Sequence, residues 1–509
     1  MIPNATLILG PPGCGKTYDL IERIKAALRE GAHPSRIAVI SFTRKAIEEM
    51  VTRACAELNM DPKQFPHIRT SHATGYHALG LQSQDVMSKA DYAEVGKLVA
   101  LAFEGTVDTA MTDGRATVSL RGTGADYLNL IDRARNRLVS LDQEYNEQDN
   151  WGLYFPKLVQ LSEQLAEYKS TKGKFDFVDM IEQYVAISEP PSLDYLFVDE
   201  AQDFTPLQWQ MVRKMAEKST HVFIAGDDDQ AIHRWTGVDV KDFIQSAKKV
   251  VRLTQSYRIP KSVHRLATRI STQIQGRIQK EFASREEEGS VQYVNHLDQI
   301  DFDQGSWTVM ARINSYAMTI SEWFQKQGYK YEIKGRPSIS ESLAKNLDTW
   351  DSISAGHSIP VWRVKKLYDA LPKQGKNAAV KRGSKQQLEV LPDEGIIAYD
   401  ELVRDFGLLV DIDIDPYDLL RVSEDMRRYI KAVERRGESL TSAPRIKVST
   451  FHAMKGGEDE NCVVYTGSTY ACVTSDYPDD EHRAFYVGVT RAKRNLYVLQ
   501  SDKKYRYEL

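Results

Sequence analysis

Two short stretches combine glycine, lysine, hydroxyl and carboxylate groups at fixed spacing. In the first, residues 6–17 read TLILGPPGCGKT, an apolar run followed by a glycine-rich turn that ends in Lys16 and Thr17. Glycines let backbone N–H groups turn inward around phosphates, and the lysine ammonium adds positive charge for the β- and γ-phosphates. The threonine hydroxyl is a suitable ligand for Mg²⁺. We therefore expect a nucleotide loop made of Gly10, Pro11, Pro12, Gly13, Cys14, Gly15, Lys16, Thr17 and Tyr18.

The second stretch, DYLFVDEAQD at 194–203, places two acids directly after an apolar strand. Asp199 is the expected Mg²⁺ ligand, mainly through water, because this ion keeps part of its hydration shell. Glu200 is then positioned to orient and deprotonate an attacking water. A helix cap or a chance surface pair would give the same two letters. The apolar strand before them and the phosphate loop elsewhere favour the catalytic interpretation.

A third stretch, AGDDDQAIHRWTGVD at 225–239, sets a run of aspartates beside a tryptophan. Runs of acids usually face water, whereas tryptophan is usually buried for most of its surface. Their close spacing therefore needs an explanation from the rest of the chain.

The elements that carry these groups alternate between strand and helix. RIAVISF, DYLFVD and HVFIAGD are apolar strands separated by helical stretches, the pattern typical of a parallel, doubly wound α/β sheet. After Val250 the pattern resumes without a second phosphate loop, which predicts a second α/β sheet. Arg258 and Arg491 lie at strand ends there and are candidates for the positive charge that γ-phosphate hydrolysis requires.

Composition limits the class of protein and of partner. The 509 residues are too many for a single core, and the net charge of −4 means that a nucleic-acid partner requires a local basic channel. Eight Lys or Arg against one acid lie between Val361 and Lys385, where a solvated face and a phosphate-binding face are both open interpretations. The four cysteines have no paired spacing, so neither a disulfide framework nor a zinc site is indicated. With no apolar run long enough for a bilayer and no signal peptide, we expect a cytoplasmic protein without a membrane partner.

Seven blocks of sequence occur in an order that is similar to one known family. They are GPPGCGKT, SFTRKA, VDEAQD, GDDDQAIHRWTG, QSYR, STFHAMKGGE and FYVGVTRA, and they extend from Gly10 to Arg491. This order resembles that of superfamily 1 DNA helicases of the UvrD/Rep type. The resemblance implies two RecA-like domains, each interrupted by a mostly helical insertion. The expected ranges are 1–77 and 169–250 for domain 1A, 78–168 for insertion 1B, 251–353 and 442–509 for domain 2A, and 354–441 for a reduced insertion 2B.

The resemblance also implies roles for single residues at the nucleotide. Gln230 looks like the family's γ-phosphate sensor, and Tyr257 is expected to stack on the adenine. Arg258 should reach the γ-phosphate and Arg491 should act as a second arginine finger. Glu458 is similar to the glutamate that contacts the ribose.

On the same pattern the third stretch links two sites, which answers the question of its acids. Gln230 belongs to the nucleotide, while His233 and Trp235 belong to a nucleic-acid groove where the indole ring stacks on a base. The acids are then part of a connecting loop rather than a surface run. Further groove residues expected by the same logic are Phe42, Thr43, Thr70, His72, Thr450 and His452.

The implied activity is an ATP- and Mg²⁺-dependent DNA helicase that translocates 3′→5′ on single strands and opens single/double-strand junctions. A monomer is expected during translocation, and a loading partner is left open. The alternatives are an ATP-gated single-strand binding module and a protein-displacing translocase with little unwinding of its own. The second insertion is shorter than is usual in the family, which favours the weak unwinder. Family members also carry an adenine-reading element before the phosphate loop; nine residues precede Gly10, so adenine selectivity is expected to rest mostly on Tyr257.

Overall fold

The computed structural model describes residues 1–41, 47, 50, 52, 55, 60–108, 117–147, 152–375 and 378–509. These residues form two compact units. Met1–Ser290 and Thr474–Thr490 make the first, and Val291–Val473 and Arg491–Leu509 make the second. This division into two is coarser than the four expected ranges, which stay a prediction.

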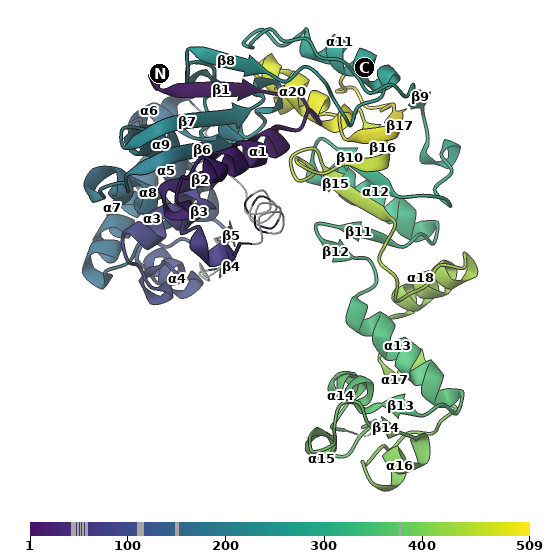
Figure 1. The fold of residues 1–509 in the computed structure, drawn as a ribbon. Helices are drawn as coiled ribbons and strands as arrows, with labels where there is room; N and C mark the ends of the chain where they lie inside the picture. The colour runs from purple at the N-terminus through teal and green to yellow at the C-terminus, as the bar shows by residue number, and fades with distance from the viewer. Residues whose placement is uncertain are drawn as a thin grey trace. The chain divides into compact units, whose positions relative to one another are not determined.

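The first unit is built on a parallel sheet. Among the described residues its strand order is β3-β2-β6-β7-β1-β8, with every neighbouring pair parallel. Figure 1 shows β1, β7, β6 and β2 side by side, with α1 (Lys16–Arg29) over one face. The strands are β1 Ala5–Leu9, β2 Ile37–Ser41, β3 His67–Thr70, β6 Leu193–Asp199, β7 Ser219–Gly226 and β8 Lys249–Arg252.

Both faces of this sheet are buried because apolar side chains point in both directions. Leu7 and Leu9 of β1 join a core with helices α8 (Phe177–Ile187) and α9 (Pro206–Ala216). Ile8 points the other way, into a core with Leu20 and Ile24 of α1. Side chains alternate along a strand, so a run that is apolar at every position requires cover on both faces. The predicted doubly wound α/β sheet is confirmed.

A helical insertion and a helix from a distant part of the chain complete this unit. The insertion has its own apolar core and, besides its helices, a two-stranded hairpin. Helix α20 (Pro478–Val489) packs against α11 (Lys261–Ser271), so residues far along the chain help to build the first unit. The further elements are α3 Ser71–Ala78, α4 Lys89–Leu98, β4 Glu104–Asp108, β5 Thr117–Arg121, α5 Ala125–Arg137, α6 Leu141–Glu147, α7 Phe155–Lys172 and α10 Val240–Ile244.

The second unit contains another sheet, of order β12-β11-β15-β10-β16-β17-β9 among the described residues. Strand β10 is central, pairs in parallel with β15 and β16, and is buried along its whole length. The mixed α/β architecture with two parallel-rich sheets agrees with the predicted fold class. The bounds are β9 Ser290–Val294, β10 Trp307–Ala311, α12 Asn314–Lys326, β11 Tyr331–Ile333, β12 Arg336–Pro337, β15 Ile446–Thr450, β16 Asp459–Tyr465, α19 Tyr470–Val473 and β17 Ala492–Leu499.

The second insertion is a small helical group with its own apolar core. Helix α13 (Glu341–Ser354) contributes side chains to two apolar cores. Ala344 and Leu347 pack with the sheet, and Trp350 and Ile353 pack within the insertion. The remaining elements are β13 Ile359–Pro360, α14 Val361–Ala370, α15 Ser384–Glu389, β14 Ile396–Ile397, α16 Tyr399–Arg404, α17 Pro416–Leu419 and α18 Glu424–Arg435.

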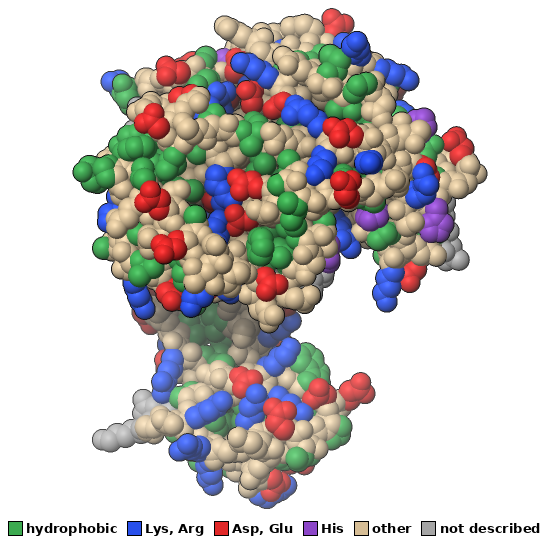
Figure 2. All heavy atoms as spheres, turned by 90° about the vertical axis from the view of Figure 1, so that its left-hand side faces the viewer, with side chains coloured by type: hydrophobic (Ala, Val, Ile, Leu, Met, Phe, Trp, Pro, Cys, Tyr) green, Lys and Arg blue, Asp and Glu red, His purple; other side chains and the backbone are tan. Residues whose placement is uncertain are grey.

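The basic stretch of this insertion is partly neutralised. Arg363 pairs with Asp348 at 2.6 Å, and Lys365 pairs with Asp393 at 2.8 Å. Lys385 lies 2.8 Å from Asp369. In the lower part of Figure 2, Lys and Arg side chains are interspersed with Asp and Glu side chains on the visible face. Of the two interpretations left open by the sequence, these pairs favour a solvated face.

In the described ranges, no helix is both long enough and apolar enough to cross a bilayer.

Candidate nucleotide and strand-binding site

The loop after β1 has the conformation expected of a phosphate-binding turn. Gly13 and Gly15 have φ angles of +74° and +79°, in the left-handed region where a Cβ would be strained. The Gly10 N–H donates to the Gly226 carbonyl at 3.1 Å, which ties the loop to the end of β7. Lys16 Nζ donates to the Gly10 carbonyl at 2.8 Å. The ammonium is therefore held against the loop that it is expected to serve.

The surroundings of Lys16 keep it charged. Burial acts to lower the pKa of Lys16, but Cys14 and the carboxylates of Glu200 and Asp227 act in the opposite direction, and the pKa is raised. Burial raises the pKa of the Cys14 thiol, so this side chain stays neutral at pH 7. The loop therefore presents a single strong positive charge to an anion.

The predicted magnesium and base positions lie at the end of β6, which β7 separates from β1 in the sheet. Asp199 is fully buried at the last position of β6, where it is in register with Ser41 of β2. Its carboxylate interacts electrostatically with Lys16, the residue before Thr17. A buried carboxylate and a hydroxyl are hard oxygen donors, so this pair fits Mg²⁺, which takes its other ligands from phosphate and water. Glu200 follows in a left-handed conformation with φ +50°, a strained geometry that is common at functional sites.

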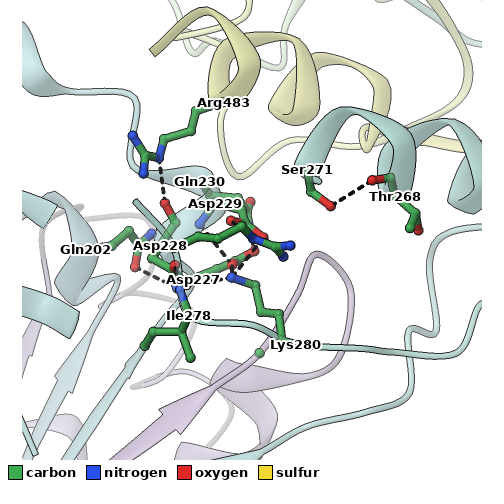
Figure 3. Close-up of polar contacts among 12 residues, drawn as sticks. Gln202, Asp227, Asp228, Asp229, Gln230, Thr268, Ser271, Ile278, Lys280 and Arg483 are labelled. Atoms are coloured by element: carbon green, nitrogen blue, oxygen red, sulfur yellow. Dashed lines mark hydrogen bonds and ion pairs between the residues drawn. The ribbon is translucent and has the colours of Figure 1, made fainter. Parts of the chain in front are cut away.

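The aspartate run after β7 is buried in the connecting loop, which agrees with the expectation that it is not a free surface run. Asp227, Asp228 and Asp229 are each 0% exposed. Lys280 Nζ lies 2.9, 2.5 and 2.9 Å from their carboxylates in that order. Arg277 makes a two-pronged contact with Asp229, at 2.8 and 2.5 Å. Figure 3 shows these acids converging on Lys280.

The pKa values of Asp229 and Asp227 in this ionic cluster are shifted in opposite directions. Burial raises the pKa of Asp229 to about 6, although Lys280 opposes the shift. The pKa of Asp227 is lowered, because the nearby ammonium groups of Lys280 and Lys16 outweigh the effect of burial. Helix α20 also reaches the cluster, where Arg483 Nε donates to the Asp228 carbonyl at 3.0 Å. The loop is thus held by three cations from two distant segments of the chain.

Gln230 and the QSYR segment also lie at the phosphate loop. Gln230 is buried and its Nε2 donates to Asp227 Oδ2 at 2.7 Å. Ser256 Oγ donates to the Pro12 carbonyl at 2.8 Å, and the Tyr257 N–H donates to the Gly13 carbonyl, also at 2.8 Å.

A Cβ on Gly13 would lie 2.3 Å from Arg258 Cβ, which explains the glycine by close packing as well as by its φ angle. Tyr257 is 73% exposed, so its ring face is open to a planar partner.

Trp235 follows Gln230 by five residues in the sequence, and its ring is exposed. It is 65% exposed, and the His233 ring lies 6.3 Å away between centroids. Arg234 stacks over the Tyr477 ring at 3.3 Å and lies 3.8 Å from Asp480. The tryptophan loop is therefore anchored by its neighbours while its own side chain faces solvent.

Two threonine–histidine pairs each begin at the last residue of a strand, one pair in each unit. Thr70 ends β3 and its hydroxyl accepts the Ala73 N–H at 3.3 Å, and Thr450 ends β15 and accepts the Ala453 N–H at the same distance. His72 and His452 follow these threonines by two residues.

The pKa of His72 is lowered to about 4 by burial, so at pH 7 the ring is neutral and can form a hydrogen bond but no ion pair. Both threonine hydroxyls cap turns, and the expected contacts of these residues with a strand stay a prediction.

The remaining predicted residues lie in the second unit or outside the described residues. Arg491 is 1% exposed and donates to the Gly457 carbonyl at 3.1 Å. The Glu458 side chain is 42% exposed and lies 3.6 Å from Lys493. Phe42 and Thr43 fall outside the described residues.

Four residues of this centre were not identified from the sequence: Gln202, Arg277, Lys280 and Arg483. A signal for the cations was available. Three consecutive acids in a loop between two sites cannot be buried without basic partners, and QGRIQKEF supplies two such residues. Gln202 lies inside VDEAQD, but its neighbours there do not reveal its partners in the fold.

Comparisons with known proteins agree on one family. The model for the UvrD/REP helicase N-terminal domain matches residues 2–251, and the model for the UvrD-like helicase C-terminal domain matches residues 412–503. The ATP-dependent DNA helicase PcrA of Bacillus subtilis is 26% identical over 66% of this chain and 50% of its own length. The ATP-dependent DNA helicase Rep of Buchnera aphidicola is 24% identical over 66% and 57%. A probable DNA helicase II homolog of Mycoplasma genitalium is 22% identical over 97% and 82%. The chain spans about half the length of the PcrA and Rep proteins that it matches.

Proposed function

We propose that this chain, which belongs to the UvrD/REP helicase family, is an ATP-driven motor that moves along single-stranded DNA and separates duplex strands. One observation carries the proposal. A single loop after β7 runs from the buried Asp227 and Gln230, at the phosphate loop, to the exposed ring of Trp235. A change at the γ-phosphate therefore has a short covalent path to a surface on which a base can stack.

Each of the following residues has a proposed role at the nucleotide. Lys16 holds the β- and γ-phosphates, and Thr17 and Asp199 hold Mg²⁺, which neutralises charge as the phosphoryl group leaves. Glu200 orients and deprotonates the attacking water. Gln230 and Arg258 contact the γ-phosphate, and Arg491 acts as the second arginine finger. Tyr257 stacks on the base and Glu458 contacts the ribose.

The proposed strand contacts follow the same plan. Trp235 stacks on an unpaired base, with His233 beside it. The threonine–histidine pairs at the ends of β3 and β15 are proposed to contact the strand backbone, as are Phe42 and Thr43. Movement in the 3′→5′ direction by a monomer rests on the family resemblance, as do the 1A, 1B, 2A and 2B ranges given above.

A second candidate is a translocase that displaces proteins and unwinds poorly. The basic stretch of the second insertion supports it, because Arg363, Lys365 and Lys385 already pair with carboxylates. Cations that are paired in this way contribute less to phosphate binding than free ones.

Steady-state ATP hydrolysis with and without single-stranded DNA, at low and moderate salt, tests the motor. Strong stimulation by a single strand and little by blunt duplex is the expected result, and no stimulation contradicts the proposal. A duplex with a 3′ tail, a duplex with a 5′ tail, and a biotinylated strand carrying streptavidin then separate the two candidates. Displacement of streptavidin without strand separation would favour the weak unwinder.

A further inference from the structure

Gln202 lies between the candidate base and the loop that carries the candidate γ-phosphate sensor. It is 1% exposed and belongs to the short turn Ala201–Asp203 that follows Glu200. Its Nε2 donates to Glu200 Oε2 at 2.5 Å. Its Oε1 accepts the Asp227 N–H at 3.1 Å, a contact visible in Figure 3. One amide thus contacts both strand-end loops.

The chemistry of the two partners fixes which way this amide faces. A backbone N–H can only donate, so it requires the carbonyl oxygen of Gln202, and an ionised carboxylate can only accept, so it requires the NH₂ group. No other common side chain of this length offers an acceptor and a donor together in neutral form. A methionine of similar length would offer neither.

The backbone opposite Gln202 is shaped to admit the amide. A Cβ on Gly226 would lie 2.3 Å from Gln202 Oε1 and 2.6 Å from the Phe243 ring. Gly226 is also the residue whose carbonyl accepts the Gly10 N–H of the phosphate loop. The same glycine therefore makes room for Gln202 and holds the nucleotide loop.

The contacts continue beyond Asp227. Its carboxylate accepts from Gln230 Nε2 at 2.7 Å and lies 2.9 Å from Lys280 Nζ. A continuous set of hydrogen bonds therefore runs from Glu200 through Gln202 and Asp227 to Gln230. Every side chain in the middle of this path is buried, so water does not compete for these bonds.

We infer that Gln202 is a positioning residue that fixes the Glu200 carboxylate relative to Gln230, so that the base and the γ-phosphate sensor act on the same water. This inference rests on the function proposed above and adds a group that itself touches neither nucleotide nor water. A sub-ångström error in placing a reacting group lowers the rate without a matching loss of binding.

Three variants test this role. Gln202→Met removes both hydrogen bonds at nearly constant length. Gln202→Asn keeps an amide but withdraws it from Glu200 by one methylene, and it serves if the methionine variant does not fold. Gly226→Ala pushes the amide away without changing it. Gln210→Met, at an exposed site on α9, is the matched control.

The expected result is a fall in kcat of about 10- to 100-fold in all three variants, with KM for ATP changed less than about threefold. The pH profile gives a second readout. A hydrogen bond to an ionised carboxylate favours the ionised form, so losing the Gln202 donor moves the acid-side midpoint of kcat to higher pH. Lys16, which interacts with Glu200, Asp199 and Asp227, is unchanged in every variant, so none of them removes the positive charge of the phosphate loop. The control should match the wild type in kcat, KM and pH profile.

Two outcomes would overturn the inference: a folded Gln202→Met protein with wild-type kcat and pH profile, or a loss of kcat that only tracks a loss of folded protein while the profile stays in place. Rescue of kcat by Gln202→Asn would count in the same direction, because it would show that any buried amide suffices. If the wild type itself lacks DNA-stimulated hydrolysis, the proposed function fails instead, and the two failures are therefore distinguishable.

Discussion

Replacing Lys280 by methionine should destabilise the first unit in a way that depends on pH. Lys280 is buried, with its Nζ within 2.9 Å of the carboxylates of Asp227, Asp228 and Asp229, which are all 0% exposed. Methionine keeps most of the length and volume but removes the charge. Arg277 then remains paired with Asp229, and Asp227 and Asp228 lose their ion pair with Lys280.

The size of the effect follows from the charges left behind. Removing one partner of a buried ion pair typically costs about 3–5 kcal/mol, which we expect at pH 8. Asp229 already has a pKa raised to about 6 by burial, and losing Lys280, which opposes that shift, raises the pKa of Asp229 further. A carboxylate with a raised folded-state pKa binds more protons when folded, so stability falls as pH rises through that pKa. One extra proton bound over two pH units is equivalent to about 2.7 kcal/mol.

Urea denaturation of the wild type and of Lys280→Met at pH 6 and pH 8 measures this difference. The variant should lose about 3–5 kcal/mol at pH 8 and roughly half of that at pH 6. Lys241→Met, at an exposed site on α10, should change stability by less than about 0.5 kcal/mol at either pH. A Lys280→Met protein that is equally destabilised at both pH values, or by less than about 1 kcal/mol at pH 8, would refute the account of the cluster as a buried charge network.

Further substitutions address the nucleotide and strand sites. Lys16→Ala should abolish ATP hydrolysis, because it removes the charge on the phosphates, while binding to a fluorescent single strand stays within about threefold of the wild type; hydrolysis above a tenth of the wild-type rate would contradict this. Trp235→Ala should keep basal hydrolysis and lose stimulation by DNA, with strand affinity reduced by about 1–3 kcal/mol in a fluorescence titration. Normal stimulation would show that the loop does not couple the two sites. Gly13→Ala should weaken nucleotide binding at least tenfold in a fluorescent-nucleotide titration, because its φ is +74° and its Cβ would lie 2.3 Å from Arg258 Cβ. Wild-type affinity in that variant would mean that the QSYR segment moves away without cost.

The parts of the site that could be predicted are those whose residues lie close together in the sequence. The nucleotide loop and Asp199 could be placed because strand, turn and functional residue are adjacent in the sequence. The assignment of the aspartate run to a connecting loop, rather than to a surface run, also followed from its position between two motif residues. The buried acids require basic partners, but Lys280 lies about fifty residues after them, and no local feature shows which basic residues meet them.

Gln202 and helix α20 show the same limit. VDEAQD fixes the order of residues around Gln202, but its contact with Asp227 requires β6 and β7 to be neighbours in the sheet. For α20, no local feature of residues 478–489 shows that this helix packs against α11. The sequence therefore predicts elements and motifs more readily than the side-chain contacts that join them.

The contribution of α20 to the first unit has a consequence for synthesis of the chain on the ribosome. Residues up to Ser290 can form the parallel sheet as they emerge, but Arg483 and the rest of α20 follow only after the whole span 291–473. At about 5–20 residues per second this span takes roughly 10–40 s to translate. During that time the carbonyl of Asp228 has no contact with Arg483 and the face of α11 that receives α20 is uncovered. The nascent first unit thus passes through a long-lived, incomplete form with exposed apolar surface, the kind of species that chaperones bind.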